Sequence, residues 1–223
     1  MNQKRKIITI DGPAGAGKST IAKRLAKELN IFYLDTGAMY RAMTLKALKT
    51  GVDLMNEEKL VAMVKNSKLD IGLSKEGQTI ILDGKDITGE IRTTEVTNST
   101  KHVANWPRVR SIVVDWQRAI AKGQSIVMEG RDIGTVVFPD ADYKFYLDAD
   151  IKERSQRRLT ELQEKGDVVD QRRLMADIVE RDQKDMKRDA SPLVKADDAI
   201  LIDSTHLSID EVIDRMLKII KNG

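Results

Sequence analysis

The sequence contains no cysteine and few aromatic residues, and each scarcity excludes a class of protein. Without cysteine the chain can form neither disulfide bonds nor a cysteine-based zinc site, which is consistent with a reducing compartment. Aromatic residues make up 4% of the 223 residues, too few for surfaces that stack single-stranded nucleic acid. The 38 basic and 35 acidic residues leave a formal charge of +3, which is too balanced for a general nucleic-acid or membrane binder.

Long hydrophobic runs are also absent. No apolar stretch approaches the roughly 18 residues of a membrane span. Near the N-terminus, only Ile7 to Ile10 are apolar before Asp11, which is too short a run for a signal peptide. We therefore expect a cytoplasmic protein. Nothing in the sequence requires a partner surface, so we also expect a monomer.

Five short apolar runs, most of them ending in an acidic residue, are separated largely by helical patterns. The runs cover residues 7–11, 31–35, 125–129, 143–148 and 199–203. Continuous apolar runs of this length are typical of parallel strands that are buried on both faces. Strands that alternate with helices predict an α/β fold with a parallel sheet, whose ligands bind beyond the carboxyl ends of the strands.

Two regions interrupt this alternation. Residues 68–92 have the pattern of a small β insertion, with turns at Glu76-Gly77 and Asp83-Gly84. Residues 151–190 are mostly charged and helical. We expect both regions to be appendages on a single core.

The segment from Gly12 to Ser19 matches the full pattern of a phosphate-binding loop, GxxxxGK[ST]. It follows a strand pattern and opens a helix, so backbone N–H groups and the positive helix end can bind phosphate oxygens. Lys18 can reach the β- and γ-phosphates, and the Ser19 hydroxyl can bind Mg²⁺. The residues predicted to bind a nucleoside triphosphate are Gly12, Pro13, Ala14, Gly15, Ala16, Gly17, Lys18, Ser19 and Thr20. The alternative is a chance glycine-rich turn, which the flanking patterns argue against.

Among phosphate-loop proteins, the sequence favours a kinase. It lacks the Asn-Lys-x-Asp motif with which GTPases bind guanine. The two appendages suit a protein that binds an acceptor and closes over the donor to exclude water. Arginines that suit phosphate oxygens follow predicted strands or begin helices, namely Arg41, Arg92, Arg110 and Arg131.

The charged helical region allows two interpretations. Arg181, Asp185 and Arg188 follow the spacing i, i+4, i+7, which predicts one shared helix face. This face could bind substrate, or it could be a solvated face stabilised by ion pairs.

Six ordered motifs between Ile8 and Ile219 resemble those of bacterial cytidylate kinases. They lie at residues 10–19, 34–41, 89–93, 107–110, 130–139 and 180–193. The resemblance implies ATP-dependent phosphorylation of CMP and dCMP. It also implies a nucleoside monophosphate kinase fold, in which a five-stranded parallel P-loop kinase core carries an acceptor-binding insertion and a helical lid. The chain would then be a single domain, with its core at about 1–38, 102–150 and 190–223, its acceptor part at about 39–101 and its lid at about 151–189.

The resemblance also implies roles for individual residues. Arg41 and Arg131 would bind the acceptor phosphate, while Arg110, Asp132 and Arg188 would line the cytosine pocket. The implied catalytic residues are Lys18, Arg131, Arg181 and Asp185. The implied acceptor-binding residues are Thr36, Arg41, Lys101, Arg110, Arg131, Asp132, Arg181, Asp185 and Arg188. Some family members have serine at the position of Lys101, so Ser99 or Thr100 could take that role here.

Several alternatives remain open from the sequence. Asp132 could be a partner of Arg131 or a cap of the following turn, and Arg110 could be a surface residue. Asp35 or Glu129 could hold metal-bound water, but both also suit capping at strand ends. For the whole chain, the alternatives are a kinase for another acceptor (UMP, dTMP or shikimate), a regulatory nucleotide-binding module and an RNA-associated ATPase.

Overall fold

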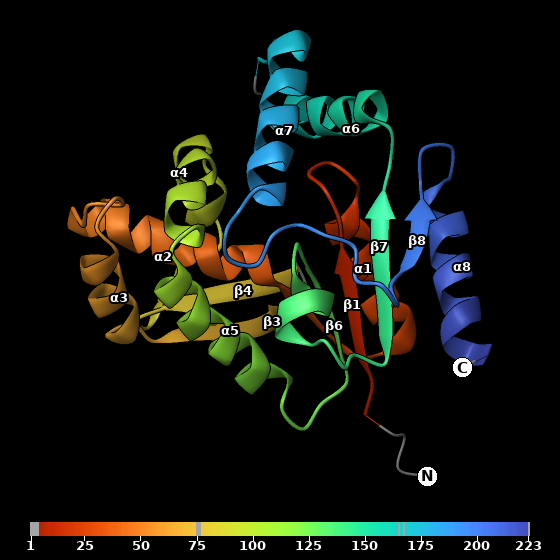
Figure 1. Cartoon of the computed structure of the whole chain (residues 1–223), viewed down its shortest axis with the longest axis horizontal. Helices are drawn as coiled ribbons and strands as arrows, with labels where there is room; N and C mark the ends of the chain where they lie inside the picture. Colours follow the sequence, from red (N-terminus) through yellow and green to blue (C-terminus); the bar gives the residue numbers. More distant parts are fainter. Residues whose placement is uncertain (1–4, 75–76, 165, 167, 223) are drawn as a thin grey trace. The chain divides into compact units, whose positions relative to one another are not determined.

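The computed structural model describes residues 5–74, 77–164, 166 and 168–222 (Figure 1). The chain forms two compact units. The first unit comprises residues 1–33 and 123–223, and the second unit comprises Leu34–Lys122. The glycine-rich loop belongs to the first unit, and the β insertion belongs to the second.

A five-stranded parallel sheet has the order β2-β6-β1-β7-β8 (Figure 1). The central strand β1 pairs with β6 and β7, so that Ile8 lies opposite Val127 and Ile10 opposite Phe145. Each strand begins and ends within one residue of an apolar run identified in the sequence, which confirms the α/β prediction. The strands are β1 (Ile7–Asp11), β2 (Phe32–Asp35), β6 (Ile126–Gly130), β7 (Tyr143–Asp148) and β8 (Ile200–Asp203).

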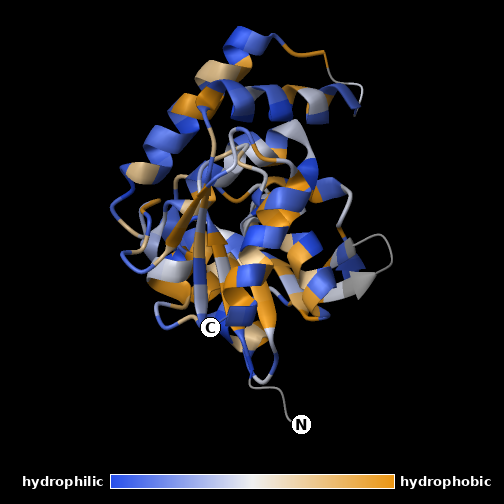
Figure 2. Ribbon diagram, turned by 90° about the vertical axis from the view of Figure 1, so that its right-hand side faces the viewer, coloured by the Kyte–Doolittle hydropathy of each residue, from blue (hydrophilic) through white to orange (hydrophobic). Residues whose placement is uncertain are grey.

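Helices α1 (Lys18–Leu29) and α8 (Ile209–Asn222) bury their apolar faces in the main core of the first unit. Ile21 of α1 and Met216 of α8 join the same cluster as Phe145 of β7. Figure 2 shows hydrophobic residues concentrated on the strands and on the inward faces of helices. Because the strands are covered in this way, polar side chains that matter for chemistry must lie at the strand ends.

Helices α6 (Ile151–Glu164) and α7 (Gln171–Met186) pack against each other around a small cluster of their own, formed by Leu159, Leu174 and Ile178. Figure 2 shows their outer faces as largely hydrophilic. The prediction that one helix face carries Arg181, Asp185 and Arg188 is wrong, because α7 ends at Met186. Beyond it the chain turns back, and the N–H of Leu193 donates to the carbonyl oxygen of Asp185 at 2.9 Å.

The second unit contains a three-stranded antiparallel sheet formed by β3 (Leu69–Ser74), β4 (Gly77–Leu82) and β5 (Lys85–Asp86). The predicted turn at Asp83-Gly84 joins β4 to β5 with φ values of 51° and 82°, which suit Asp and Gly. The other predicted turn, at Glu76-Gly77, lies partly outside the described residues, because Glu76 is not among them.

The helices of this unit are α2 (Thr36–Thr50), α3 (Glu57–Lys65), α4 (Thr94–Ala104) and α5 (Pro107–Ala121). Pro107 begins α5, as its fixed φ favours. We expected α5 to belong to the core, but it packs against α3 and α4 and lies in the second unit. In the described part of the chain, no helix combines the length and apolar composition that a membrane span needs.

Phe145→Ala should lower the free energy of unfolding by about 3–5 kcal/mol, because it leaves a cavity where a ring was fully packed. Phe145 is 1% exposed, whereas Leu201 on the edge strand is 56% exposed and serves as the control. Leu201→Ala should cost less than about 1 kcal/mol in the same urea titration followed by circular dichroism. Equal losses in the two variants would contradict this placement of the core.

Candidate functional site

The phosphate loop connects β1 to α1, and its shape requires glycine at the first position. Gly12 has a φ of +148°, and a Cβ there would lie 2.0 Å from the carbonyl oxygen of Leu147. A larger residue could not fit without moving the backbone of β7. The loop leads directly into α1, so its N–H groups lie at the positive end of that helix.

Lys18, the first residue of α1, is buried with only 6% of its surface exposed. Its Nζ donates to the carbonyl oxygen of Pro13 at 2.7 Å. Burial lowers the pKa of Lys18, and the positive charge of Arg131 lowers it further, to about 7, against the opposing charges of Glu129 and Asp182. An anionic phosphate would offset the cost of holding the buried Lys18 near the half-buried Arg131.

Ser19 and Thr20 differ in exposure, since Ser19 is half-buried and Thr20 is exposed. Among the described residues, no group of three or more acidic, histidine or cysteine side chains could hold a metal ion. Protein-bound Mg²⁺ usually keeps several water ligands and is coordinated by phosphate oxygens of the substrate. A single protein hydroxyl beside the phosphate loop is compatible with that coordination. The hydroxyl at this position of the loop is that of Ser19.

The two carboxylates left open as holders of metal-bound water already have protein partners. Asp35 caps α2 by accepting the N–H of Ala38 at 3.0 Å, as one of the alternatives proposed. Glu129 accepts a hydrogen bond from the Tyr33 hydroxyl at 2.9 Å.

Asp185 joins two of the predicted arginines in the first unit. Its Oδ2 accepts from Arg131 Nε at 3.0 Å, and its Oδ1 accepts from Arg188 Nη2. Burial alone would raise the pKa of Asp185, but the charges of Arg131 and Arg188 outweigh it and hold that pKa below its usual value. Asp185 is therefore ionised at neutral pH, and its geometry suits orienting the two guanidinium groups rather than donating a proton.

Arg181 belongs to the same helix as Asp185 and has an exposed side chain. Its charge contributes to the lowered pKa of Asp185, so the two groups lie within electrostatic reach of each other. Helix α7 thus supplies one exposed cation, Arg181, and one half-buried anion, Asp185, to this part of the site.

Asp132 follows Arg131 directly after β6 and is buried, with 5% of its surface exposed. Its backbone carbonyl accepts the N–H of Val137 at 3.3 Å, which is the i, i+5 bond that begins the π-helical turn Ile133–Val137, and also the N–H of Val136 at 2.9 Å. Such turns are rare and occur often at functional sites. The turn fixes the direction in which the chain leaves the Arg131-Asp132 pair.

Asp11, at the end of β1, anchors this π-helical turn. Its two carboxylate oxygens accept the N–H groups of Ile133 at 2.9 Å and Gly134 at 2.7 Å. Burial raises the pKa of Asp11 to about 6, although these two hydrogen bonds oppose the rise. The central strand therefore holds the phosphate loop and the Arg131-Asp132 turn in one unit.

In the second unit, Asp35 also binds two arginines. Its Oδ2 accepts from Arg41 Nη2 at 2.7 Å and from Arg92 Nη2 at 3.0 Å. Burial would raise the pKa of Asp35, but the charges of Arg41 and Arg92 and the N–H of Ala38 together lower it. Arg41 is thereby held in a fixed orientation at the start of α2.

Arg110 is buried in the second unit, with 4% of its surface exposed, so the interpretation as a surface residue is wrong. Its Nη1 donates to the carbonyl oxygen of Ala104 at 3.1 Å, and its guanidinium lies 5.2 Å from the centre of the Tyr40 ring. A guanidinium held over an aromatic face and among backbone acceptors is an ordered donor.

The remaining predicted residues of the second unit differ in their exposure. Thr36 is buried, whereas Lys101 is exposed on α4. Of the two neighbours that could replace Lys101, Thr100 is buried and its hydroxyl donates to the carbonyl oxygen of Val96 at 2.7 Å. Ser99 is half-buried.

The sequence reasoning missed two buried carboxylates, Asp11 and Asp182. Asp182 accepts the N–H of Ala14 in the phosphate loop at 2.9 Å. The sequence does contain a signal for it, because Leu174, Ile178 and Asp182 follow each other at intervals of four and so share the apolar face of α7. A carboxylate on such a face must have a buried partner.

Comparisons with known proteins point to one family over nearly the whole length of the chain. A family model described as cytidylate kinase matches residues 8–222. The chain is 50% identical over 214 residues to a cytidylate kinase from Alkaliphilus oremlandii, covering 96% of this chain and 97% of that protein. It is 48% identical over 218 residues to a cytidylate kinase from Desulforamulus reducens, covering 98% of each. A shikimate kinase from Bacteroides thetaiotaomicron shares the fold, with a TM-score of 0.50, 13% identity and coverage of 97% and 98% of the two chains.

Lys18→Met should strongly weaken nucleoside triphosphate binding yet stabilise the fold near neutral pH. The pKa of Lys18 is lowered from 10.5 to about 7 in the folded chain, so wild type gains stability as pH rises through that window. At pH 7 the variant should be more stable by roughly 2 kcal/mol, after subtraction of the lost hydrogen bond to Pro13. Urea denaturation at pH 7 and pH 9.5 measures the difference, which should shrink at the higher pH.

The exposed Lys27 of the same helix provides the control. Lys27→Met should bind the triphosphate normally and show no pH-dependent gain. A Lys18→Met variant less stable than wild type at pH 7 would refute the electrostatic account of the loop.

Proposed function

Because the chain belongs to the cytidylate kinase family of nucleoside monophosphate kinases, we propose that it transfers the γ-phosphoryl group of ATP to CMP and dCMP. The products are ADP and CDP or dCDP. The observation that carries this proposal is the burial of Lys18 within electrostatic reach of Arg131, at a phosphate loop. Two neighbouring cations of this kind suit a transition state in which charge spreads over the oxygens of a transferring phosphoryl group.

The donor is assigned to the phosphate loop. The backbone and side chains of Gly12 to Thr20 bind the phosphates of ATP, with Lys18 on the β- and γ-phosphates. Ser19 holds Mg²⁺, which when bound neutralises charge on the phosphate oxygens.

Acceptor-binding roles are assigned to residues of each unit taken by itself. Arg41 and Arg131 bind the phosphate of CMP, and both are already oriented by a carboxylate. Arg110, Asp132 and Arg188 bind cytosine, whose amino group suits a carboxylate and whose ring nitrogen and carbonyl suit arginine. Arg181 and Asp185 lie at the acceptor sugar and the transferring group. Thr36 and Lys101 complete the set, and Lys101 contributes least because its side chain is exposed.

We propose direct in-line transfer without a covalent intermediate on the protein. The attacking phosphate oxygen of CMP is already ionised near pH 7, because the second pKa of a phosphate monoester is about 6. No strong general base is then needed. Asp185 is ionised and paired with two arginines, and we do not assign it the role of a general base. The chain contributes positioning and charge stabilisation by Lys18, Arg131 and Arg181.

We also propose that the enzyme works as a monomer in the cytoplasm, with small nucleotides as its only partners and no nucleic acid or membrane. The balanced charge and the scarcity of aromatic residues support this. Other acceptors, such as UMP, dTMP and shikimate, are weaker candidates.

An acceptor panel tests the reaction itself. ADP release, measured by a coupled assay, should be fast with CMP and dCMP and at least about tenfold slower with UMP, dTMP and shikimate, because a site built for hydrogen bonds rejects acceptors that leave its groups unpaired. The same assay with RNA and no monophosphate serves as the control. ADP release that depends on RNA alone would exclude the proposed reaction.

Arg188→Ala should separate acceptor binding from donor binding. Arg188 is buried and paired with Asp185, so its loss should raise the KM for CMP about 30-fold or more while changing the KM for ATP less than about threefold. Arg172, an exposed arginine on the first turn of α7, is the control, and Arg172→Ala should change neither value. Equal effects of Arg188→Ala on CMP and ATP would show that the cytosine assignment is wrong.

A further inference from the structure

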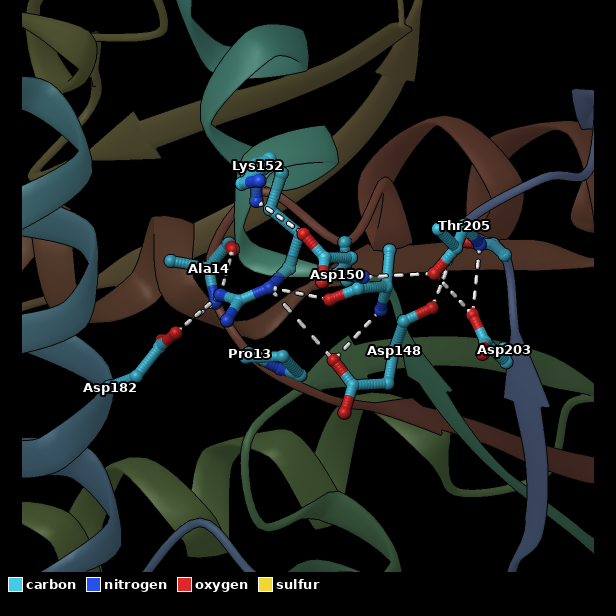
Figure 3. A network of polar contacts seen from close by, with 12 residues as sticks. Pro13, Ala14, Asp148, Asp150, Lys152, Asp182, Asp203 and Thr205 are labelled. Carbon is cyan, nitrogen blue, oxygen red and sulfur yellow. Dashed lines mark hydrogen bonds and ion pairs between the residues drawn. The ribbon is translucent and has the colours of Figure 1, made fainter. Parts of the chain in front are cut away.

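Asp182 differs from the other acidic residues of α7 because it is almost fully buried, with 4% of its surface exposed. Its Oδ1 accepts the N–H of Ala14, in the phosphate loop, at 2.9 Å. Its Oδ2 accepts from Arg154 Nη1, on the first turn of α6. Figure 3 shows Asp182 approaching Ala14 from α7.

Arg154 completes the same arrangement from the other helix. Its Nη1 donates to the carbonyl oxygen of Ala14 at 2.8 Å, and its Nε donates to the carbonyl oxygen of Ala149 at 2.9 Å. The backbone of Ala14 is therefore held at both its N–H and its C=O, by two oppositely charged side chains that also bind each other. A buried ion pair persists only when its remaining hydrogen-bonding groups are satisfied in this way.

Apolar packing reinforces the hydrogen bonds that Ala14 makes with Asp182 and Arg154. The side chain of Ala14 packs against the cluster of Leu159, Leu174 and Ile178 that joins α6 to α7. The next residue, Gly15, has a φ of +77°, and a Cβ there would lie 2.7 Å from the carbonyl oxygen of Arg154. The phosphate loop and the first turn of α6 thus touch backbone to backbone, with no room for a side chain.

The position of Asp182 on α7 gives this contact a consequence for catalysis. Asp185, one turn further on, binds Arg131, and Arg181 immediately precedes Asp182. A shift of α7 along its axis would therefore move Arg181 and Asp185 away from the loop that carries Lys18. The charge of Asp182 also counters the lowering of the Lys18 pKa.

We propose that Asp182, together with Arg154, is a positioning residue that fixes α6 and α7 on the phosphate loop and so sets the distance between the donor phosphates and the groups carried by α7. This inference rests on the proposed function, because it gives the contact a role in phosphoryl transfer. Asp182 acts through Ala14 and is assigned no contact with either substrate. The N–H of Ala14 is engaged by Asp182, which leaves the other N–H groups of the loop for phosphate.

Asp182→Asn tests the proposal, because it keeps the size and one acceptor oxygen of the side chain but removes the charge that faces Arg154. We expect kcat to fall about 10- to 100-fold, since misplacement by about 1 Å has effects of that size, with the KM values for ATP and CMP changed less than about threefold. Asp177, an exposed carboxylate on the same helix, is the matched control, and Asp177→Asn should keep the wild-type kcat.

Arg154→Lys is the second variant, in case Asp182→Asn does not fold. It keeps the positive charge but loses the forked donors to Ala14 and Ala149, so we expect a similar fall in kcat. In the double variant Asp182→Asn/Arg154→Lys, the fall should be no larger than in the more damaging single variant, because the two side chains act as one unit. All rates are taken per folded molecule, below the unfolding transition.

Amide hydrogen exchange of Ala14 in the substrate-free protein provides a readout that does not depend on turnover. Asp182→Asn should speed this exchange, and Asp177→Asn should not. Failure of the wild type to use CMP would contradict the proposed function alone, and the exchange rates would then decide the present inference. Wild-type kcat in Asp182→Asn, or unchanged exchange of Ala14, would overturn it.

Discussion

The cost of burying positive charge is the constraint on which the rest of the site depends. In the first unit Lys18 is buried and Arg131 is half-buried, and the positive charge of Arg131 makes Lys18 more costly to keep charged. The negative charges of Glu129, Asp182 and Asp185 oppose this cost. Glu129 lies at the end of a strand, and the other two lie on α7. These carboxylates lower the cost of keeping the two cations charged, and Asp182 also accepts the N–H of Ala14 in the phosphate loop.

The same solution appears in the second unit, where Asp35 orients Arg41 and Arg92. An arginine that is already held by a carboxylate loses little side-chain freedom when it binds a nucleotide, which improves affinity without adding contacts. Asp35 and Asp185 thus orient the arginines that they bind. They are the parts of the structure that turn flexible arginine side chains into fixed donors.

Local sequence patterns were sufficient for the strands, the phosphate loop and the turn at Asp83-Gly84, because each depends on neighbouring residues alone. They failed where distant residues decide the outcome. We expected residues 107–121 to belong to the core, but α5 lies in the second unit, where its buried face carries Val109, Val113 and Gln117. The end of α7 before Arg188, the anchoring of the π-helical turn by Asp11 and the burial of Asp182 against Ala14 likewise depend on contacts across the chain.

Both tryptophans of the sequence, Trp106 and Trp116, lie in the second unit, and the indole N–H of Trp106 donates to the carbonyl oxygen of Leu54 at 2.9 Å. Intrinsic tryptophan emission is therefore a spectroscopic label of Leu34–Lys122 alone, while far-ultraviolet ellipticity reports on both units together. A single unlabelled sample can reveal whether the two units unfold cooperatively, and whether adding ATP changes the environment of the tryptophans in the second unit.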